Sequence, residues 1–156
     1  MCMLLQPHPA DSTYAAAYSA AWTNDPQELL AFFANDGVYT DVAMGADYRG
    51  HDEILRFHRW MLKSAPDSVI EFSEPATQQD RLYLEWTWSG SFDGPLRLRD
   101  GRRLEATGRR FSIVGIGSCR FREDGKLTRH RDYWDAAELV EQLTRPDLSP
   151  SQSQTP

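Results

Sequence analysis

Near the C-terminal end of the sequence, a histidine and an aspartate lie two residues apart in an alternating run. In Lys126–Trp134, every second side chain shares one face of a strand, so His130, Asp132 and Trp134 are expected on the same side. In an apolar cavity, burial raises the pKa of Asp132 and a neighbouring cation lowers it. Such tuning suits general acid–base work, and we predict that Asp132 is catalytic and that His130 tunes it or relays protons. The alternative is a structural carboxylate that pairs with an arginine or caps a nearby backbone group.

A second carboxylate, Asp41, follows the stretch FFANDGVYT, and Tyr39 shares its face of a short predicted strand, Val38–Val42. Two carboxylates in different environments can divide acid and base roles between them. The alternative for Asp41 is a turn residue that hydrogen-bonds its own backbone. Tyr39 and Tyr18 are candidate donors to developing negative charge, although aromatic residues on a helix face, such as Tyr18, also fit core packing.

Aromatic and apolar side chains are predicted to form the ligand-binding walls. Trp134 shares the face of Asp132 and is suited to stacking on a flat ligand. Trp86 and Trp88 fall on one face of a predicted strand, where they line the pocket or pack in the core or against a second subunit. Phe57 and Met61 of a predicted helix complete this lining.

The remaining candidate groups lack the close spacing of a metal site. His51 and His58 lie seven apart with no closely spaced partner, so we predict two partly exposed helix histidines. Cys2 and Cys119 form no metal or disulfide pattern and are expected to be free thiols. The arginines in 97–110 are read as a solvated loop, with an anion-receiving loop at a pocket mouth as the alternative.

Helices come first along the chain, and strands follow. Helical spacing begins at Asp11, breaks at Thr23–Pro26, and resumes in a second helix that is expected to end before Asn35. A third helix is expected between His51 and Pro66. After Pro66, apolar residues recur at every second position, as in strands, and a last helix carries apolar residues at helical spacing. The candidate strands are Val69–Glu74, Arg81–Phe92, Arg102–Arg122 and Lys126–Trp134, and the last helix is Asp135–Leu143.

This order predicts an α+β domain in which a curved antiparallel sheet is covered by about three N-terminal helices and a short C-terminal helix. We expect a flexible N-terminus over 1–11, one domain over 12–144, and a disordered Ser-, Pro- and Gln-rich tail over 145–156. A net charge of -6 argues against nucleic acid as a partner. With no basic leader and no apolar run of roughly 20 residues, we expect a cytoplasmic protein that does not enter membranes.

Four stretches within Tyr14–Leu143 resemble the SnoaL-like and ketosteroid-isomerase-like branch of the nuclear transport factor 2-like superfamily. They are FFANDGVYTDVAMGADYRGHDEI, EWTWSGSFDGP, ATGRRFSIVGIGSCRFREDGKL and RHRDYWDAAELVEQL. The resemblance implies a cone-shaped sheet closed by helices, a pocket at the wide end, and a homodimer formed through the sheet. It also implies that Asp132 matches a catalytic carboxylate of limonene epoxide hydrolase-like relatives. Asp41 and Tyr18 match the general base and the oxyanion donor of the isomerases.

Two departures limit what the resemblance implies. Gly117 stands where the isomerases carry a protonated Asp, and Trp86 and Trp88 stand where the epoxide hydrolases carry an Arg and an Asp. We therefore predict a cofactor-independent SnoaL-like cyclase or isomerase that acts on a small, mostly apolar polyketide-like or terpenoid substrate. The alternatives are an epoxide hydrolase or epoxide-opening cyclase, and a noncatalytic small-ligand-binding or dimeric assembly module.

Overall fold

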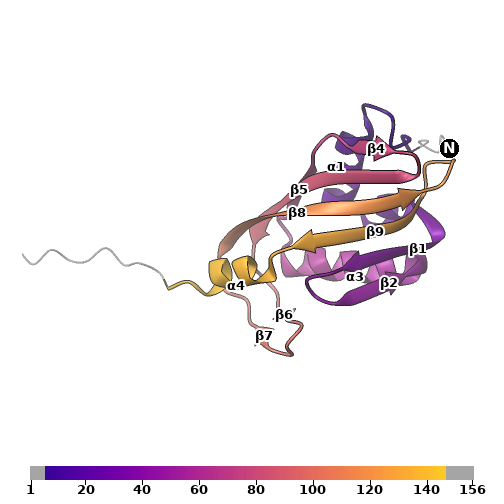
Figure 1. Cartoon of the computed structure of the whole chain (residues 1–156). Helices are drawn as coiled ribbons and strands as arrows, with labels where there is room; N and C mark the ends of the chain where they lie inside the picture. Colours follow the sequence, from indigo (N-terminus) through magenta and orange to yellow (C-terminus); the bar gives the residue numbers. More distant parts are fainter. Residues whose placement is uncertain (1–5, 147–156) are drawn as a thin grey trace, which may run out of the picture.

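The structure is a computed structural model that describes residues 6–146 (Figure 1). Residues 1–5 and 147–156, which fall in the predicted flexible N-terminus and tail, lie outside the described residues, as does Cys2. The elements follow in the order α1 (Tyr14–Asn24), α2 (Pro26–Leu30), β1 (Phe33–Asp41), β2 (Ala46–Arg49), α3 (Gly50–Ser64), β3 (Val69–Phe72), β4 (Ala76–Gln78), β5 (Arg81–Ser91), β6 (Leu96–Arg97), β7 (Arg103–Leu104), β8 (Arg110–Phe121), β9 (Leu127–Trp134) and α4 (Ala136–Thr144).

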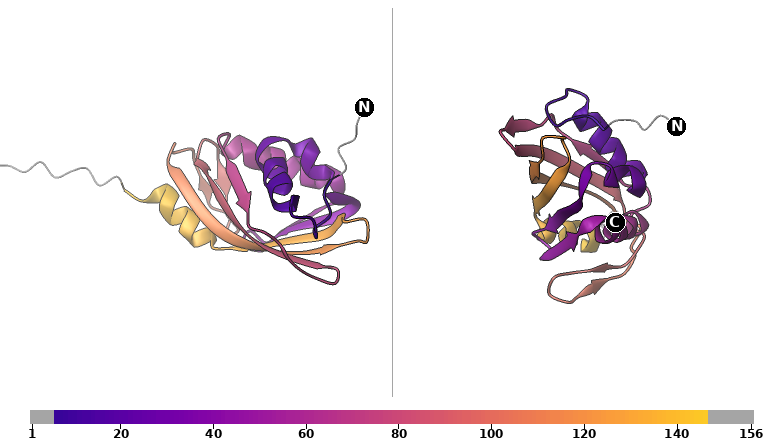
Figure 2. Two further views of the ribbon diagram at one scale, coloured as in Figure 1. Left: turned by 90° about the horizontal axis from the view of Figure 1, so that it is seen from above. Right: turned by 90° about the vertical axis from the view of Figure 1, so that its right-hand side faces the viewer.

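The main sheet is curved, and its strands run in the order β2-β1-β9-β8-β5-β3, with β4 also paired to β5. Helices α1, α2 and α3 lie on its concave side, whereas α4 lies at the opposite end beside the β6–β7 hairpin (Figures 1 and 2). The predicted α+β class, curved sheet and helical cover are confirmed. The sheet is mixed, because β1 and β9 pair in parallel while the other neighbours are antiparallel.

The predicted second helix is shorter than expected. Asp25 caps α2 by accepting a hydrogen bond from Gln27 N at 2.8 Å, and Pro26 occupies the first turn. The helix nevertheless ends at Leu30, because the backbone carbonyl of Phe32 accepts from Leu127 N of β9 at 2.8 Å and the chain continues as strand β1. An apolar run of this length fits a buried helix or a buried strand equally well, so the pairing with β9 determines that the residues after Leu30 form a strand.

The register of β9 contains a bulge that the alternating pattern did not predict. Arg120 pairs with Arg129, whereas the next residue of β8, Phe121, pairs with Leu127, so Thr128 is the extra residue. Leu127 is therefore buried, although strict alternation placed its side chain on the face of the strand that His130 does not share. From Arg129 to Trp134 the alternation is regular, and it turns His130 and Asp132 inward.

Two other expectations about the strands are corrected. No strand was predicted between Val42 and the third helix, but 46–49 pair with β1 as strand β2. The long strand predicted over Arg102–Arg122 is divided: β7 pairs only with β6 in a separate two-stranded sheet, and β8 joins the main sheet. Among residues 6–146, no helix has the length and apolar character needed to cross a membrane.

Two apolar clusters fill the space between the sheet and its cover. The first lies between α1–α3 and the sheet, and the second gathers residues of β5, the β6–β7 hairpin, β8 and α4. His58 is buried near the first cluster, where its Nε2 lies 2.7 Å from the carbonyl of Trp22, so the prediction of partial exposure is wrong for this residue. Burial lowers the pKa of His58, against the opposing effect of that carbonyl.

Candidate active site

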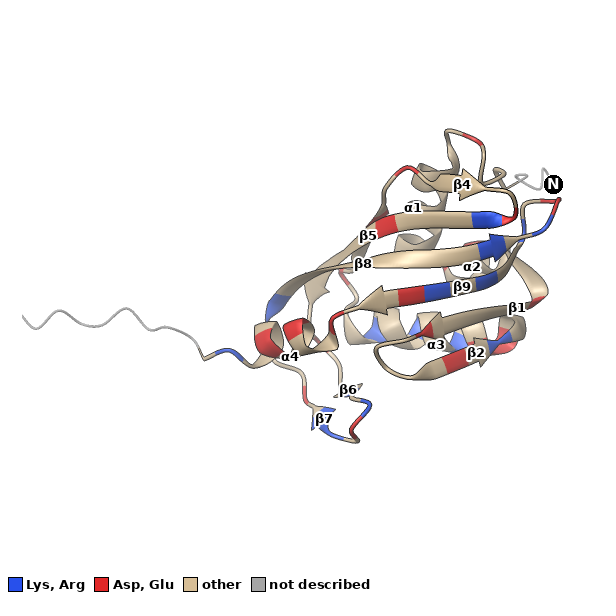
Figure 3. Ribbon diagram, in the orientation of Figure 1, with Lys and Arg blue, Asp and Glu red and all other residues tan. Residues whose placement is uncertain are grey.

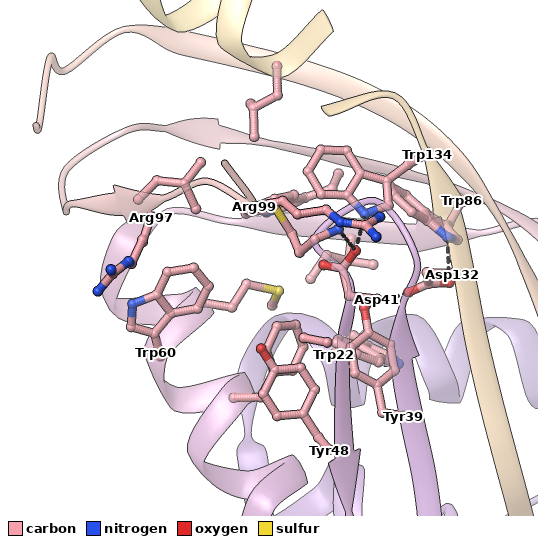
Figure 4. A pocket seen from close by; sticks show the side chains of 18 of the residues that line it. Trp22, Tyr39, Asp41, Tyr48, Trp60, Trp86, Arg97, Arg99, Asp132 and Trp134 are labelled. Carbon is pink, nitrogen blue, oxygen red and sulfur yellow. Dashed lines mark hydrogen bonds between the residues drawn. The ribbon is translucent and has the colours of Figure 1, made fainter. Parts of the chain in front are cut away.

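A pocket of about 320 Å³ lies between the sheet, α3 and the β6–β7 hairpin (Figure 4). This volume is at the lower end of the range for sites that enclose a small organic molecule, roughly 300–1,000 Å³. Its walls are mainly aromatic and aliphatic, and its charged lining residues are two aspartates and two arginines. The lining is Trp22, Tyr39, Asp41, Met44, Ala46, Tyr48, Phe57, Trp60, Met61, Ile70, Phe72, Trp86, Trp88, Leu96, Arg97, Leu98, Arg99, Asp132, Trp134 and Leu139.

The predicted site residues divide into two groups. Those that line the pocket are Asp41, Asp132, Tyr39, Trp134, Trp86, Trp88, Phe57 and Met61. His130 and Tyr18 lie behind Asp132, are fully buried, and are not part of the pocket wall. The structure thus brings both carboxylates to one apolar cavity and places the predicted histidine and one predicted tyrosine in the layer beneath.

Asp132 is held by three side-chain donors. Trp86 Nε1 donates to Oδ1 at 2.9 Å, His130 Nε2 lies 2.6 Å from the same oxygen, and the Tyr39 hydroxyl donates to Oδ2 at 2.8 Å. The residue is 5% exposed. A buried carboxylate with this number of donors is fixed in orientation.

His130 connects Asp132 to the helical layer. Its Nδ1 lies 2.6 Å from the Tyr18 hydroxyl, so Tyr18, His130 and Asp132 form one buried chain of hydrogen bonds. Burial is the largest single effect and lowers the pKa of His130, but the interactions with Asp132 and Cys119 together exceed it and raise the pKa to about 10. The pKa of Tyr18 is raised well above its ordinary value, chiefly by burial. The His130–Asp132 pair is therefore a buried ion pair at neutral pH.

Asp41 occupies a different environment. Its Oδ1 accepts from Met44 N at 3.0 Å and from Trp134 Nε1 at 2.9 Å, and the residue is 5% exposed. Burial raises the pKa of Asp41 to about 6; the two hydrogen bonds oppose this shift, and the negative charge of Asp132 adds to it. A carboxyl group with this pKa is present in both protonation states near neutral pH.

Two glycines of β8 make room for this arrangement. A Cβ atom at Gly115 would lie 2.2 Å from Cζ2 of Trp86, so the indole packs directly on the backbone. A Cβ atom at Gly117 would lie 2.9 Å from His130 Nε2 and 3.3 Å from Asp132 Oδ1. The position where the isomerases carry an oxyanion-hole aspartate therefore has no space for a side chain.

Three polar residues of the pocket were not predicted as individual site residues. Tyr48 lies on the unpredicted strand β2, and its hydroxyl has no hydrogen-bond partner among residues 6–146. Arg97 and Arg99 lie on the β6–β7 hairpin, in a segment that was read as a solvated loop. The alternation of leucine and arginine over 96–99 was the signal for a strand with one buried and one exposed face.

Comparison with known proteins agrees with this architecture. Residues 14–130 match the SnoaL-like domain. A hypothetical protein with a ketosteroid isomerase-like fold from Catenulispora acidiphila, solved in complex with trimethylamine, has 23% identity and a TM-score of 0.70 over 86% of this chain and 95% of its own. A putative SnoaL-like polyketide cyclase from Jannaschia sp. CCS1 has 10% identity and a TM-score of 0.73 over 94% of this chain and 98% of its own.

A third similar structure is AclR, a putative hydroxylase from Streptomyces galilaeus, with 23% identity and a TM-score of 0.67 over 87% of this chain and 82% of its own. At these identities the similarity establishes a common fold and carries no information about a common reaction. No curated protein matches the chain. The resemblance seen in the sequence is nevertheless confirmed, because the domain match covers most of the chain. This protein belongs to the SnoaL-like domain family.

Proposed function

We propose that the protein is an acid–base enzyme of the SnoaL-like cyclase or isomerase kind, acting on a small, mostly apolar, oxygen-bearing molecule in the pocket. One observation carries the proposal: Asp41 opens onto an apolar pocket, and burial raises its pKa to about 6. The most efficient proton carriers have a pKa near the working pH. A carboxyl group of this kind can remove a proton from the substrate and return it at another atom.

The proposed reaction begins at a carbon next to a carbonyl group. The Asp41 carboxylate takes the proton, the C–H electron pair forms a C=C bond, and the carbonyl oxygen becomes an enolate. In an isomerisation, protonated Asp41 returns the proton to another carbon of the conjugated system. In a cyclisation, the enolate carbon attacks a second carbonyl of the same molecule, and Asp41 protonates the alkoxide that forms. Both sequences restore Asp41 and consume no other reagent.

Asp132 has the complementary role in this proposal. Its three donors fix its orientation, and its negative charge adds to the raised pKa of Asp41. His130, which does not reach the pocket, is then a positioning residue that acts through Asp132. The assignment differs from the sequence prediction, in which Asp132 was the principal acid or base. Asp132 is held by three side-chain donors, whereas Asp41 has one side-chain donor and a pKa raised to about 6.

Tyr48 is the donor that we propose for the enolate oxygen. The hydroxyl of Tyr39 already donates to Asp132, and that of Tyr18 faces His130 outside the pocket. Tyr48 lines the pocket, and burial raises its pKa, so its hydroxyl stays protonated at neutral pH. A donor that is free before the reaction stabilises the charge that forms during it.

Deuterium exchange into 2-tetralone tests the proposal. This bicyclic ketone is apolar and carries acidic protons next to its carbonyl, so a positioned base accelerates their replacement by deuterium in D₂O. We expect the protein to speed loss of the C1 proton signal in the NMR spectrum and Asp41→Asn to reduce the added rate by roughly 100-fold or more. Asp36→Asn, an exposed aspartate on the same strand, is the matched control.

The alternatives give different results in the same experiment. No acceleration, or equal acceleration by Asp41→Asn, overturns proton abstraction by Asp41. Binding of the ketone without exchange would favour a noncatalytic binding module. Epoxide opening would instead be detected as diol or cyclic ether formation from an apolar epoxide, with no exchange in the ketone.

A further inference from the structure

The mouth of the pocket carries two arginines that differ from the other arginines of the same segment. Arg102, Arg103 and Arg110 each form an ion pair with a nearby carboxylate, at 2.7, 2.8 and 3.7 Å. Arg97 and Arg99 line the pocket and form no ion pair or side-chain hydrogen bond with any residue in 6–146. The hairpin that carries them projects beyond the main sheet, with basic residues on both of its arms (Figure 3).

The hairpin is fixed in place by its own alternation. Leu96 and Leu98 are buried in the second apolar cluster, so the side chains between and after them turn outward to the mouth. At the base of the hairpin, the backbone N–H groups of Asp93 and Gly94 both donate to the carbonyl of Ser64, at 2.8 and 3.1 Å. The position of Arg97 and Arg99 therefore follows from packed and hydrogen-bonded neighbours.

Each arginine lies beside a different part of the pocket. Arg99 extends over the turn after β1, where its Nε would be 2.9 Å from a Cβ atom at Gly45, and it points toward Asp41 and Trp134 (Figure 4). Arg97 lies beside Trp60, an indole that is 39% exposed although it belongs to the pocket wall (Figure 4). An exposed indole and two guanidinium groups therefore provide an apolar face and charged donors in the same pocket.

These positions distinguish between classes of substrate. A neutral apolar molecule would form no ionic interaction with the two guanidinium groups. The chain as a whole has a net charge of -6 and therefore does not attract anions in general. A carboxylate matches the paired donors of guanidinium, while the aromatic walls between the mouth and the two aspartates accept a flat apolar body.

We propose that the substrate is an apolar acid: a flat, largely hydrocarbon molecule whose carboxylate is received by Arg97 and Arg99 at the pocket mouth. This inference deepens the proposed function and depends on it only for the pocket being the substrate site. Because the anion stays at the mouth, the apolar body extends into the pocket toward the carboxylates of Asp41 and Asp132. Arg97 and Arg99 then select the substrate and set its direction of entry.

Paired ligands of one shape test the proposal without any turnover. 2-Naphthoate and 2-naphthamide have the same ring system and differ chiefly in charge, and their dissociation constants are measured by isothermal titration calorimetry at pH 7.5. We expect the protein to bind the carboxylate about tenfold more tightly than the amide or better, as for hydrogen bonds to charged groups. In the Arg97→Gln/Arg99→Gln variant this preference falls to about one. Arg102→Gln, which removes an ion-paired arginine of the same hairpin, leaves it unchanged.

Three results would overturn the inference: equal affinity for acid and amide, a preference that survives in the double variant, or binding of neither ligand. Thermal unfolding of the double variant shows whether the fold is kept, and the two single variants provide the same readout with a smaller change. Asp41→Asn separates this inference from the proposed function. It should abolish deuterium exchange while it keeps the preference for 2-naphthoate, so loss of exchange alone leaves the role of the arginines standing.

Discussion

Asp41 and Asp132 are register partners on the parallel strands β1 and β9, and both carboxylates open onto the same pocket. Their surroundings nevertheless differ. Asp132 accepts three side-chain hydrogen bonds, one of them from a histidine, whereas Asp41 accepts one from an indole and one from a backbone N–H. The pKa of Asp41 is raised mainly by burial, and the neighbouring Asp132 adds to the shift.

The raised pKa of Asp41 predicts that Asp41→Asn stabilises the folded protein at neutral pH. The folded-state pKa of about 6 exceeds the ordinary value of 3.8, so folding favours the protonated form. This contribution is complete below about pH 4 and is lost as pH rises through 6, at a cost of roughly 2–3 kcal/mol. Urea unfolding between pH 4 and 8 should show a growing advantage for Asp41→Asn. Parallel curves for the two proteins would contradict the shifted pKa.

The buried His130–Asp132 pair predicts that replacing His130 alone destabilises the protein more than replacing both residues. His130→Leu leaves Asp132 as an uncompensated buried charge and should reduce the free energy of unfolding by about 3–5 kcal/mol. Adding Asp132→Leu removes that charge and should recover part of the loss, measured by urea unfolding at pH 7. His51→Leu, at a half-buried histidine that contacts one backbone carbonyl, should cost far less. A double variant as unstable as the sum of its single variants would refute the coupling.

Contact between the Trp86 indole and the backbone predicts that Gly115→Ala damages the site. The added methyl group would lie 2.2 Å from the ring, so Trp86 must move and its hydrogen bond to Asp132 is lost. Overpacking of this kind costs about 1–3 kcal/mol. Near-UV circular dichroism reports the indole movement, and urea unfolding reports the cost. Ser112→Ala, on an exposed position of the same strand, should change neither, and a native spectrum for Gly115→Ala would contradict the tight packing.

The outer face of the sheet predicts a homodimer. Val114, Ile116 and Tyr133 are 63%, 43% and 42% exposed on the neighbouring strands β8 and β9, and a contiguous apolar patch of this kind is typical of an interface. Sedimentation velocity should give a dimer for the wild-type protein and a monomer for Val114→Lys/Ile116→Lys. Gln27→Lys, on the helical side, should remain dimeric. If the wild-type protein sediments as a monomer at all concentrations, the prediction of a homodimer is wrong.

The sequence predicted the fold closely where local signals agree with tertiary packing. Pro26 begins α2, Asp135 caps α4 by accepting from Ala137 N and Glu138 N, and the period-two runs mark β5, β8 and β9. The errors arise where distant pairing overrides the local signal. Phe33 joins a strand because it pairs with β9. The bulge at Thr128 turns the side chain of Leu127 to the other face of the sheet.

The candidate site was predictable in part for the same reason. Alternation grouped His130 with Asp132 and Tyr39 with Asp41, and the register pairing of β1 with β9 brings Asp41 and Asp132 to one pocket. Whether Tyr18 faces the pocket depends on the helix–sheet packing, which one sequence does not encode locally. Arg97 and Arg99 were considered only as part of the 97–110 segment, because a strand of two residues is too short to produce a clear alternating pattern.

Strand β9 lies between β1 and β8, although it is the last strand to be synthesised. Until it is made, β1 and β2 with the helices form one fragment of the sheet, and β8, β5 and β3 form another, with no direct pairing between them. Closing contacts over about ninety residues carries a large loop-closure entropy and slows folding. β9 closes the sheet at the position where Asp41 meets Asp132, so completing the sheet and assembling the site are one event. A chain that stops before residue 127 lacks β9 and can have neither.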